Sequence, residues 1–465
     1  MRESALVHTA DPQARTAVRA PAHRIDPRRT PITVVEVDLD EARVRPAHSV
    51  AVLDKPLAGD IMALVRKHRR PLGVICARIV AGDDAESELV TTAERELRSE
   101  LAAHLALDDR IEAESAPQRN DDPVAAPCVR ARARALAEPP PISVVVATRE
   151  RPAQLAHCLD SLLRVDYPQF EIVVVDNAPA TSATARLVAE RYCGRVTYLR
   201  EPVRGLANAH NRGLTAAGGK LVAFTDDDVV VDRDWLPAVA EAFRSSADAG
   251  CVTGLILPAQ LETAAQAMLE RRGGFAKGFR RVEHRASAPD RHRLFPFTAG
   301  RLGSGANMAF TADALRAIGG FDPGTGTGTV ARGGDDLLAF FRVAAKGYSV
   351  VYQPDALVWH HHRREPAALA DQAFGYGVGL GAYLTAAIAR EPRMVGPLLR
   401  RLPQGALYAL RNSRTDAADP ATWPPRLSRL ERYGLLYGPI AYGRSRWRAR
   451  TADASAGGRV GRGHG

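Results

Sequence analysis

Cysteine is scarce in this chain, and its spacing suits neither cross-linking nor zinc binding. The 465 residues contain five cysteines, at positions 76, 128, 158, 193 and 251. The number is odd, and no two cysteines are spaced as C-x-x-C. This pattern argues against a disulfide scaffold and against a zinc site of the cysteine type. A reducing compartment is the simplest expectation, so we predict a cytoplasmic protein.

Long apolar segments are lacking as well. Residues 1–30 are polar, rich in Arg, Pro and Ala, and contain no apolar run of the kind found in signal peptides. We therefore expect a disordered N-terminus without a secretory signal. Residues 373–389 carry no charge, but these 17 residues are slightly short for a membrane span and include four glycines. Glycines favour close helix packing, so we expect a packed helix there, with membrane insertion as the alternative.

Lysine is absent from the C-terminal part of the chain, which is nevertheless strongly basic. From Arg390 to the end there are 15 arginines and 5 acidic residues, an excess equal to the net charge of +10 of the whole chain. Such a segment suits an anionic partner, and the alternative is a solvated arginine-rich tail. Because apolar runs lie between the arginines, we expect residues 366–450 to form a helical extension in peripheral contact with the anionic inner face of a membrane. A disordered tail is expected over 451–465.

The chain is too long for one ordinary domain, and two or three folded units are expected. The first is a small α/β module over residues 31–107. Its apolar patterns predict strands at 32–39 and 72–79 and helices at 60–67 and 91–107. The module contains no cluster of chemically reactive residues, so an interaction or packing role is expected. Residues 108–141, which end in three prolines, are expected to be a linker.

Residues 142–365 are predicted to form a doubly wound α/β domain. Strands and helices alternate at short spacing, with strands at 142–147, 170–175, 196–199 and 221–225 and helices at 153–163, 184–192 and 208–217. Ligands of such sheets bind at the carboxyl ends of the strands. This rule points to Thr148 and Glu150 after the first strand, to Asp176 at the end of the second, and to the aspartates after the fourth.

Three consecutive aspartates, Asp226, Asp227 and Asp228, follow directly after an apolar strand. Adjacent carboxylates repel one another, which lowers stability unless a cation is bound. In an extended segment residues i and i+2 face the same side, so Asp226 and Asp228 can share a cation while Asp227 points elsewhere. Carboxylates suit Mg²⁺ or Mn²⁺, which also bind a nucleotide diphosphate. The alternative is an acidic surface turn or a helix cap.

Two further acidic residues, Asp335 and Asp336, follow a pair of glycines and precede a helical run. A carboxylate at such a helix start can act as a general base toward an attacking hydroxyl, and plain N-capping is the alternative. A run of three histidines begins at His360. A neutral imidazole would complete a metal site beside the carboxylates, although packing is the commoner fate of a histidine. The Gly-rich segment 303–308 could let backbone N–H groups approach a phosphate or a sugar, or could be a simple turn.

Taken in order, these segments resemble the inverting glycosyltransferases of family 2, of an actinobacterial type with an extra N-terminal module. The resemblance covers residues 142–364, roughly half the chain. It rests on an ordered series of motifs: Ser143–Pro152, Val174–Asn177, Gly205–Gly213, Phe224–Asp228 (D-x-D), Gly319–Asp322, Gly333–Asp336 (E-D) and Trp359-His360. It implies the GT-A fold, a doubly wound mixed sheet that binds a nucleotide sugar with Mn²⁺ or Mg²⁺.

The resemblance also implies a role for each matching residue. Asp336 falls on the catalytic base, with Asp335 beside it, and the metal ligands fall on Asp226, Asp228 and His360. Donor binding falls on Thr148, Glu150, Asp176, His210, Asp226 and Asp227, and acceptor binding on Gly305, Asn307 and Trp359. The chain departs from the family pattern at three places: His210 stands where Arg is usual, Asp335 where Glu is usual, and Arg149 and Glu150 where Tyr and Asn are common.

The reaction implied is a single in-line displacement with inversion, onto a glycan, a polyprenyl-linked or a metabolite hydroxyl. One alternative is a nucleotidyltransferase of similar fold, but such enzymes usually carry a Gly-rich loop after the first strand, and Thr148–Pro152 has no glycine. A second alternative is a non-catalytic basic binding protein. The chain contains no recognisable nucleic-acid-binding motif, so no nucleic-acid partner is expected. Intact Asp228 and Asp336 argue against a degenerate, inactive transferase.

Overall fold

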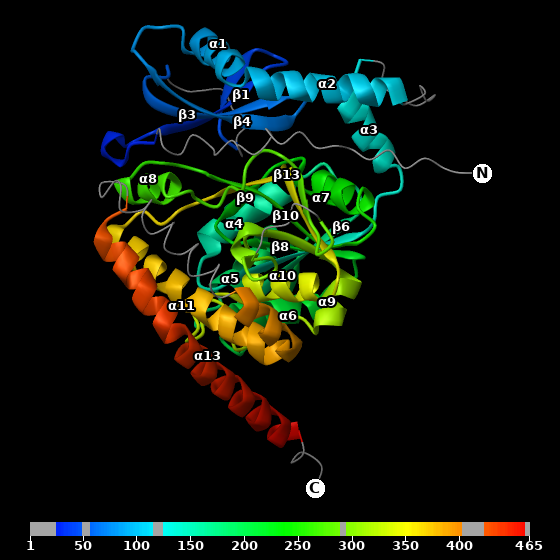
Figure 1. Ribbon diagram of the computed structural model, residues 1–465, viewed down its shortest axis with the longest axis vertical. Helices are drawn as coiled ribbons and strands as arrows, with labels where there is room; N and C mark the ends of the chain where they lie inside the picture. Colours follow the sequence, from blue (N-terminus) through cyan, green and yellow to red (C-terminus); the bar gives the residue numbers. More distant parts are fainter. Residues whose placement is uncertain (1–24, 49–55, 115–123, 289–293, 402–422, 461–465) are drawn as a thin grey trace, which may run out of the picture.

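The computed structural model describes residues 25–48, 56–114, 124–288, 294–401 and 423–460 (Figure 1). Its centre is a nine-stranded sheet with the order β11-β13-β10-β12-β8-β5-β6-β7, and β9 pairs with β13 outside this path. The strands are β5 (Ile142–Thr148), β6 (Phe170–Asn177), β7 (Thr197–Glu201), β8 (Leu221–Asp226), β9 (Val229–Val231), β10 (Ala249–Pro258), β11 (Val282–His284), β12 (Asn307–Thr311) and β13 (Ser349–His360). Strands β5 to β8 run parallel, whereas β12 runs antiparallel to both β8 and β10. The doubly wound mixed α/β sheet predicted from the sequence is confirmed.

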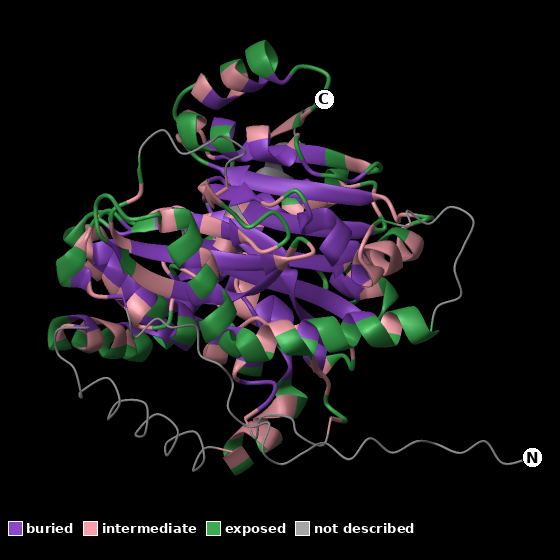
Figure 2. Cartoon of the chain, turned by 90° about the horizontal axis from the view of Figure 1, so that it is seen from above, coloured by how far each residue is buried: buried purple, intermediate pink, exposed green. Residues whose placement is uncertain are grey.

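Helices cover both faces of this sheet, and its strands are buried between them (Figure 2). One face carries α4 (Pro152–Leu162), α5 (Ala183–Arg191) and α7 (Trp235–Arg244), and the other α6 (Leu206–Ala216), α9 (Ala312–Ile318), α10 (Asp335–Ala345) and part of α11 (Pro366–Arg390). In β5, Val144 and Val146 point to the first face, whereas Val145 and Ala147 point to the second. A strand that is apolar on both faces requires cover on both sides. The short helix α8 (Ala264–Arg271) lies beyond the end of β10.

A second sheet, with the order β2-β1-β3-β4, packs on the large one (Figure 1). Its strands are β1 (Thr33–Asp38), β2 (Arg43–Pro46), β3 (Gly59–Lys67) and β4 (Arg70–Ile79), and α1 (Ala85–Glu96) and α2 (Arg98–Glu114) follow. In β3, Ile61 and Ala63 face the helices. Met62 and Leu64 face a core shared with Trp359 of β13. The small sheet is therefore buried on both faces, by its own helices and by the large domain.

Strand β3 corrects the helix predicted at 60–67. The segment is apolar without alternation because both of its faces are buried, and such a run cannot be assigned to strand or helix from periodicity alone. The single helix predicted over 91–107 is also wrong, since the chain forms two helices that meet at Leu97.

The segment predicted to be a linker, residues 108–141, contains regular structure. Helix α2 continues to Glu114, and α3 (Pro127–Ala135) follows residues 115–123, which lie outside the described part. Arg132 of α3 forms ion pairs with Glu241, at 2.7 Å, and Asp355, at 2.6 Å. Because both carboxylates belong to the large domain, α3 is docked on it. Of the N-terminus predicted to be disordered, residues 1–24 lie outside the described part, and Ile25 is buried.

Two long helices, α11 and α13 (Pro425–Val460), lie side by side along the large domain (Figure 1). Their contact is close because glycines meet at it: Gly438 faces Gly381, and a Cβ on Gly377 would lie 1.9 Å from the Glu431 carbonyl oxygen. Helix α11 contains the uncharged segment 373–389. Among the described helices, none is both long and apolar enough to cross a membrane. The tail predicted to be disordered from 451 is helical up to Val460, and 461–465 lie outside the described residues.

Candidate active site

A cleft of about 760 Å³ opens at the carboxyl ends of β5 and β8. These two strands are parallel neighbours, with Ala147 opposite Asp226, so the loops that follow them meet at the same edge of the sheet. The predicted site residues that line the cleft are Thr148, Asp226, Asp227, Asp228, Gly305, Asp335, Asp336 and His360. Segments more than two hundred residues apart thus contribute to one cavity.

Asp226, Asp228 and His360 form a cluster of potential metal ligands, with one oxygen or nitrogen atom of each within 4.8 Å of the others. Asp227 does not take part. Its carboxylate accepts hydrogen bonds from the Thr148 hydroxyl, at 2.7 Å, and from the Arg151 guanidinium, at 3.1 Å. All three aspartates line the cleft, but only Asp226 and Asp228 belong to the ligand cluster, as the alternation of an extended segment predicts.

His360 is the last residue of β13, and its Nε2 lies 3.4 Å from Asp228 Oδ1. Its other ring nitrogen lies 2.9 Å from Nδ1 of His362, whose Nε2 is 2.7 Å from the carboxylate of Glu270. This chain of contacts fixes the ring orientation of His360. Burial lowers the pKa of His360 to about 4, although Asp228 opposes the shift. The imidazole is therefore neutral near pH 7, as a metal ligand must be.

The charges of the cleft favour a cation at this cluster. Burial raises the pKa of Asp226, and the carboxylates of Asp228, Asp227, Asp335 and Asp336 raise it further. A cation between Asp226 and Asp228 would remove this repulsion. Two carboxylates and one neutral imidazole also match the ligand preferences of Mn²⁺ and Mg²⁺. The residues present therefore fit the metal that the sequence predicts.

Asp335 and Asp336 begin α10, after Gly334 with a φ of +86°. A side chain at Gly334 would also meet the Gly379 carbonyl oxygen, so glycine is required on two grounds. Asp336 is half-buried, and burial together with the Asp335 carboxylate raises its pKa to about 6. Asp335 is buried, 3.5 Å from Nδ1 of His210. Of the two carboxylates, that of Asp336 is the more accessible to the cleft.

Three residues predicted to bind the donor are placed differently. His210 is buried between Phe224 and Phe321 and does not line the cleft, so it does not replace the usual arginine as a phosphate contact. Asp176 is fully buried and accepts a hydrogen bond from the Tyr198 hydroxyl at 3.0 Å. Glu150 accepts hydrogen bonds from the backbone N–H groups of residues 180 and 181, so it braces a loop.

Two of the predicted acceptor residues are structural. Asn307 is buried, and its amide donates to the carbonyl oxygens of Leu255 and Ala356 and accepts from the Trp235 indole. Trp359 is fully buried in the core shared by the two sheets. Neither side chain lines the cleft. Asn307 is enclosed by its hydrogen-bond partners, and Trp359 is enclosed by the apolar side chains of the shared core. Only Gly305 of the three lines the cavity.

Sequence reasoning missed several residues that line the cleft or support the residues lining it. Arg151, His362 and Glu270 fix the orientation of the acidic turn and of His360, as described above. Arg204, Lys277 and Arg363 bring positive charge to the cavity. A basic residue has no spacing rule that marks it as lining a cleft, so no signal identified the last three. The alternation of a strand end could have indicated that His362 shares a side with His360.

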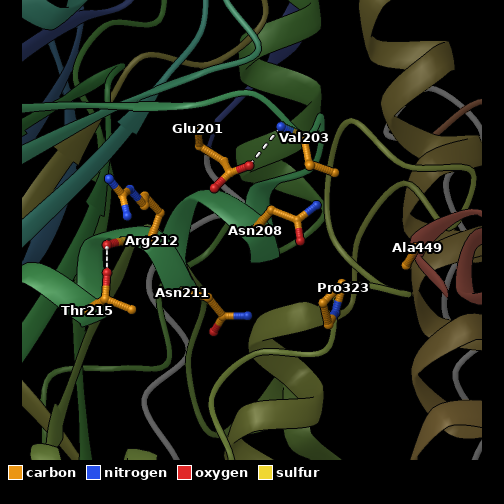
Figure 3. Close-up of a pocket in the computed structure, with 8 residues that line it drawn as sticks. All are labelled: Glu201, Val203, Asn208, Asn211, Arg212, Thr215, Pro323 and Ala449. Atoms are coloured by element: carbon orange, nitrogen blue, oxygen red, sulfur yellow. Dashed lines mark hydrogen bonds between the residues drawn. The ribbon is translucent and has the colours of Figure 1, made fainter. Parts of the chain in front are cut away.

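A second, smaller hollow of about 320 Å³ lies beside α6, on the side where Ala449 of α13 also lines it (Figure 3). Its lining residues are Glu201, Val203, Asn208, Asn211, Arg212, Thr215, Pro323 and Ala449. The Asn211 amide donates to the Phe321 carbonyl oxygen and accepts from its N–H, and the Thr215 hydroxyl donates to the Arg212 carbonyl oxygen. The Glu201 carboxylate accepts the N–H of Val203, so these polar groups bond to the local backbone.

Comparison with known proteins decides the family. The model of "Glycosyltransferase like family 2" matches residues 139–375, just over half of the chain. The chain belongs to this family. The match spans both the aspartate turn at the end of β8 and the start of α10, so the cleft described above lies within the family 2 domain.

Curated relatives match the same domain. A pre-mycofactocin glycosyltransferase of Mycobacterium tuberculosis is 27% identical over 270 residues, 58% of this chain and 51% of the relative. A poly-β-1,6-N-acetyl-D-glucosamine synthase of Staphylococcus epidermidis is 25% identical over 223 residues, 47% of this chain and 49% of the relative. The chain spans about half the length of these relatives. A solved structure of mannosyltransferase PcManGT from Pyrobaculum calidifontis, in complex with GDP-Man and Mn²⁺, matches at 20% identity and a TM-score of 0.41 over 66% of this chain and 92% of that one.

Proposed function

We propose that this protein is a metal-dependent inverting glycosyltransferase, which transfers a sugar from a nucleotide-diphosphate sugar to an acceptor hydroxyl. One observation carries the proposal: a cation-type ligand set (Asp226, Asp228 and His360) and a separate carboxylate of raised pKa, Asp336, line the same cleft. Membership of glycosyltransferase family 2 supports it.

The donor half of the reaction needs positive charge at the diphosphate. A bound Mn²⁺ or Mg²⁺, held by Asp226, Asp228 and His360, would neutralise the leaving nucleoside diphosphate. Arg204 and Arg363 line the same cleft and add positive charge that does not depend on a metal. Thr148 and Arg151 hold the Asp227 carboxylate, and Arg151 also donates to Asp228 at 3.2 Å, so this arginine fixes the acidic turn.

The acceptor half of the reaction needs a base. Asp336 takes the proton of the acceptor hydroxyl, whose oxygen then forms a bond to the anomeric carbon as the bond from that carbon to the diphosphate oxygen breaks. Attack opposite the leaving group inverts the configuration. Asp335 precedes Asp336 at the start of α10, with its carboxylate 3.5 Å from Nδ1 of His210, and is assigned a positioning role.

The acceptor is a glycan, a polyprenyl-linked or a metabolite hydroxyl. The relatives support this breadth, because one is named for pre-mycofactocin and another for a glucosamine polymer. A surface feature of α13 favours a membrane-bound setting for the reaction. Tyr433, Leu436, Ile440 and Trp447 are 64%, 76%, 59% and 66% exposed, and their spacing places them on one face of the helix.

Arginines accompany this apolar face. Arg429, Arg432, Arg444 and Arg448 are exposed on or beside it. A helix that presents exposed aromatic and aliphatic side chains together with arginines is suited to an anionic membrane surface. We propose peripheral contact of α13 with such a surface.

A thermal-shift screen of nucleotide sugars with and without Mn²⁺ tests the donor and the metal together. We expect one donor to raise Tm only when Mn²⁺ is present, and Asp228→Ala to abolish that shift. Transfer by the wild-type protein should be lost in Asp336→Asn, whereas donor binding should persist. Full transfer activity in Asp336→Asn would refute the base, and equal donor binding without metal would refute the metal dependence.

A further inference from the structure

Four metal-binding side chains meet in the N-terminal part of the chain, away from the cleft. They are His68 in the β3–β4 turn, His104 and Asp108 in α2, and Cys128 in α3. Each offers one ligand atom within 4.8 Å of the others. His104, Asp108 and Cys128 are buried, and His68 is partly exposed. Neither the family 2 reaction nor the candidate active site uses any of them.

The separations of the ligand atoms, from 2.8 to 3.9 Å, lie around those of a tetrahedral zinc site. Zinc bonds of about 2.0–2.1 Å to nitrogen and about 2.3 Å to sulfur place neighbouring ligands about 3.3–3.6 Å apart. Here Nδ1 of His68 lies 2.8 Å from Asp108 Oδ2 and 3.1 Å from Nε2 of His104, and Cys128 Sγ lies 3.8 and 3.9 Å from the same two nitrogens. The distance from His104 Nε2 to Asp108 Oδ2 is 3.5 Å.

Hydrogen bonds describe this arrangement less well than a bound cation does. Three polar atoms, from Asp108, His104 and Cys128, converge on Nδ1 of His68, but a neutral ring nitrogen carries at most one proton. If that proton is donated to Asp108, the Cys128 thiol is left with a long contact of 3.9 Å to Nε2 of His104. A cation at the centre instead accepts a lone pair from all four groups.

The surroundings of the cluster are those of a metal site. Ligating histidines commonly donate their second nitrogen to a carboxylate, which fixes the ring. The second nitrogen of His68, Nε2, lies 3.5 Å from Asp40 Oδ1. The second carboxylate oxygen of Asp108 accepts the backbone N–H of Cys128 at 3.0 Å.

The cysteine does not suit a nucleophilic role. Its sulfur is closed off from solvent, so it is not accessible to a substrate.

We propose that His68, His104, Asp108 and Cys128 bind a structural Zn²⁺ ion. The ion would join three elements: the β3–β4 turn, α2 and α3. The turn and α3 both dock on the large domain, through Arg70 and Arg132, which share the carboxylate of Asp355. Zinc at this point would stabilise the junction between the small module and the catalytic domain.

Metal analysis of the full-length protein tests the proposal. After gel filtration in excess Mg²⁺, to saturate the cleft, we expect about one zinc per chain by mass spectrometry of the metal. Exchange for Co²⁺ should produce a thiolate-to-cobalt charge-transfer band, which requires a cysteine ligand and so cannot arise from Asp226, Asp228 and His360. Cys128→Ser should lose the band and bind zinc at least about 10-fold more weakly. Cys193→Ser, which removes an exposed thiol outside the cluster, should retain both.

Two results would overturn the proposal. One is wild-type protein that contains no stoichiometric zinc and gives no thiolate band with Co²⁺. The other is full zinc retention by Cys128→Ser. If Cys128→Ser does not fold, the wild-type protein still decides: removal of zinc by a chelator should lower Tm, and Zn²⁺ but not Mg²⁺ should restore it.

Discussion

The backbone N–H of Gly305 donates a hydrogen bond of 2.9 Å to Oδ2 of Asp336, so the Gly-rich loop holds the proposed base at the start of α10. A Cβ on residue 305 would lie 3.3 Å from the Cβ of Asp336. The Gly-rich segment thus contributes the backbone N–H of Gly305 to the site, and the absence of a side chain at this residue leaves room for the Asp336 side chain. The other carboxylate oxygen accepts the N–H of Leu337, and both bonds favour the ionised form.

The pH dependence of transfer should report the state of Asp336. Burial and the Asp335 charge raise its pKa to about 6, so the carboxyl group holds its proton to a higher pH than an exposed aspartate does. A protonated carboxyl cannot accept the proton of the acceptor. We therefore expect kcat/KM to fall about tenfold per pH unit below pH 6 and to level off above it. A profile that is flat between pH 5 and pH 8 would contradict Asp336 as the base.

The contact between His360 and His362 should matter for metal affinity. Glu270 and His362 orient the ring of His360, and loss of such support typically weakens metal binding about 10–100-fold. We expect His362→Ala to raise the Kd for Mn²⁺ by that factor in calorimetry. His361→Ala is the matched control, because it keeps the backbone N–H of residue 361 that bonds to the Asp228 carbonyl oxygen. Equal losses of Mn²⁺ affinity in both variants would argue against a specific role of the His362 and Glu270 contacts in orienting His360.

The helix pair α11–α13 should not tolerate a methyl group at its closest point. A Cβ on Gly377 would lie 1.9 Å from the Glu431 carbonyl oxygen, so Gly377→Ala should force the helices apart. Overpacking of this kind costs about 1–3 kcal/mol and should lower Tm by several degrees. Gly396→Ala is the control, because a Cβ there meets no atom within 4 Å. A thermal melt in which both variants match the wild type would show that the helices adjust freely.

Membrane contact of α13 should depend on its exposed apolar face. We expect Leu436→Ser combined with Trp447→Ser to reduce sedimentation with phosphatidylglycerol vesicles at least about threefold, because both side chains are mostly exposed and would enter the membrane interface. Val80→Ser removes an equally exposed side chain from the small module and should have no effect. Unchanged sedimentation of the double variant would exclude α13 as the contact.

Much of the large domain could be predicted from sequence because its signals are local. Strands β5 and β8 both end in polar residues. Because they are parallel, their carboxyl ends meet at one edge of the sheet, and Thr148 and Asp226 lie there as predicted. The separation of Asp227 from its neighbours followed from the two-residue repeat of an extended chain. Motif matching was less reliable where a side chain can turn inward. His210 and Trp359 occupy motif positions and Asn307 lies in the Gly-rich segment, yet each is buried and none lines the cleft.

The remaining features depend on contacts between distant segments. Strand β3 has no periodicity because both of its faces are buried, one of them by a domain more than a hundred residues away. The proposed zinc ligands are spread over sixty residues, and only His104 and Asp108 are a helical turn apart. No spacing rule can identify such a set from the sequence.

The core shared by the two sheets has a consequence for how the chain can be divided. Trp359 is adjacent to the proposed metal ligand His360, and it packs against Met62 and Leu64 of the small module. A fragment that begins at residue 142 would leave this tryptophan and its neighbours Val230 and Leu257 facing water. The family 2 domain defined by sequence comparison is therefore not expected to be stable without the small module. Strand β13 and the small module should unfold as a single cooperative unit.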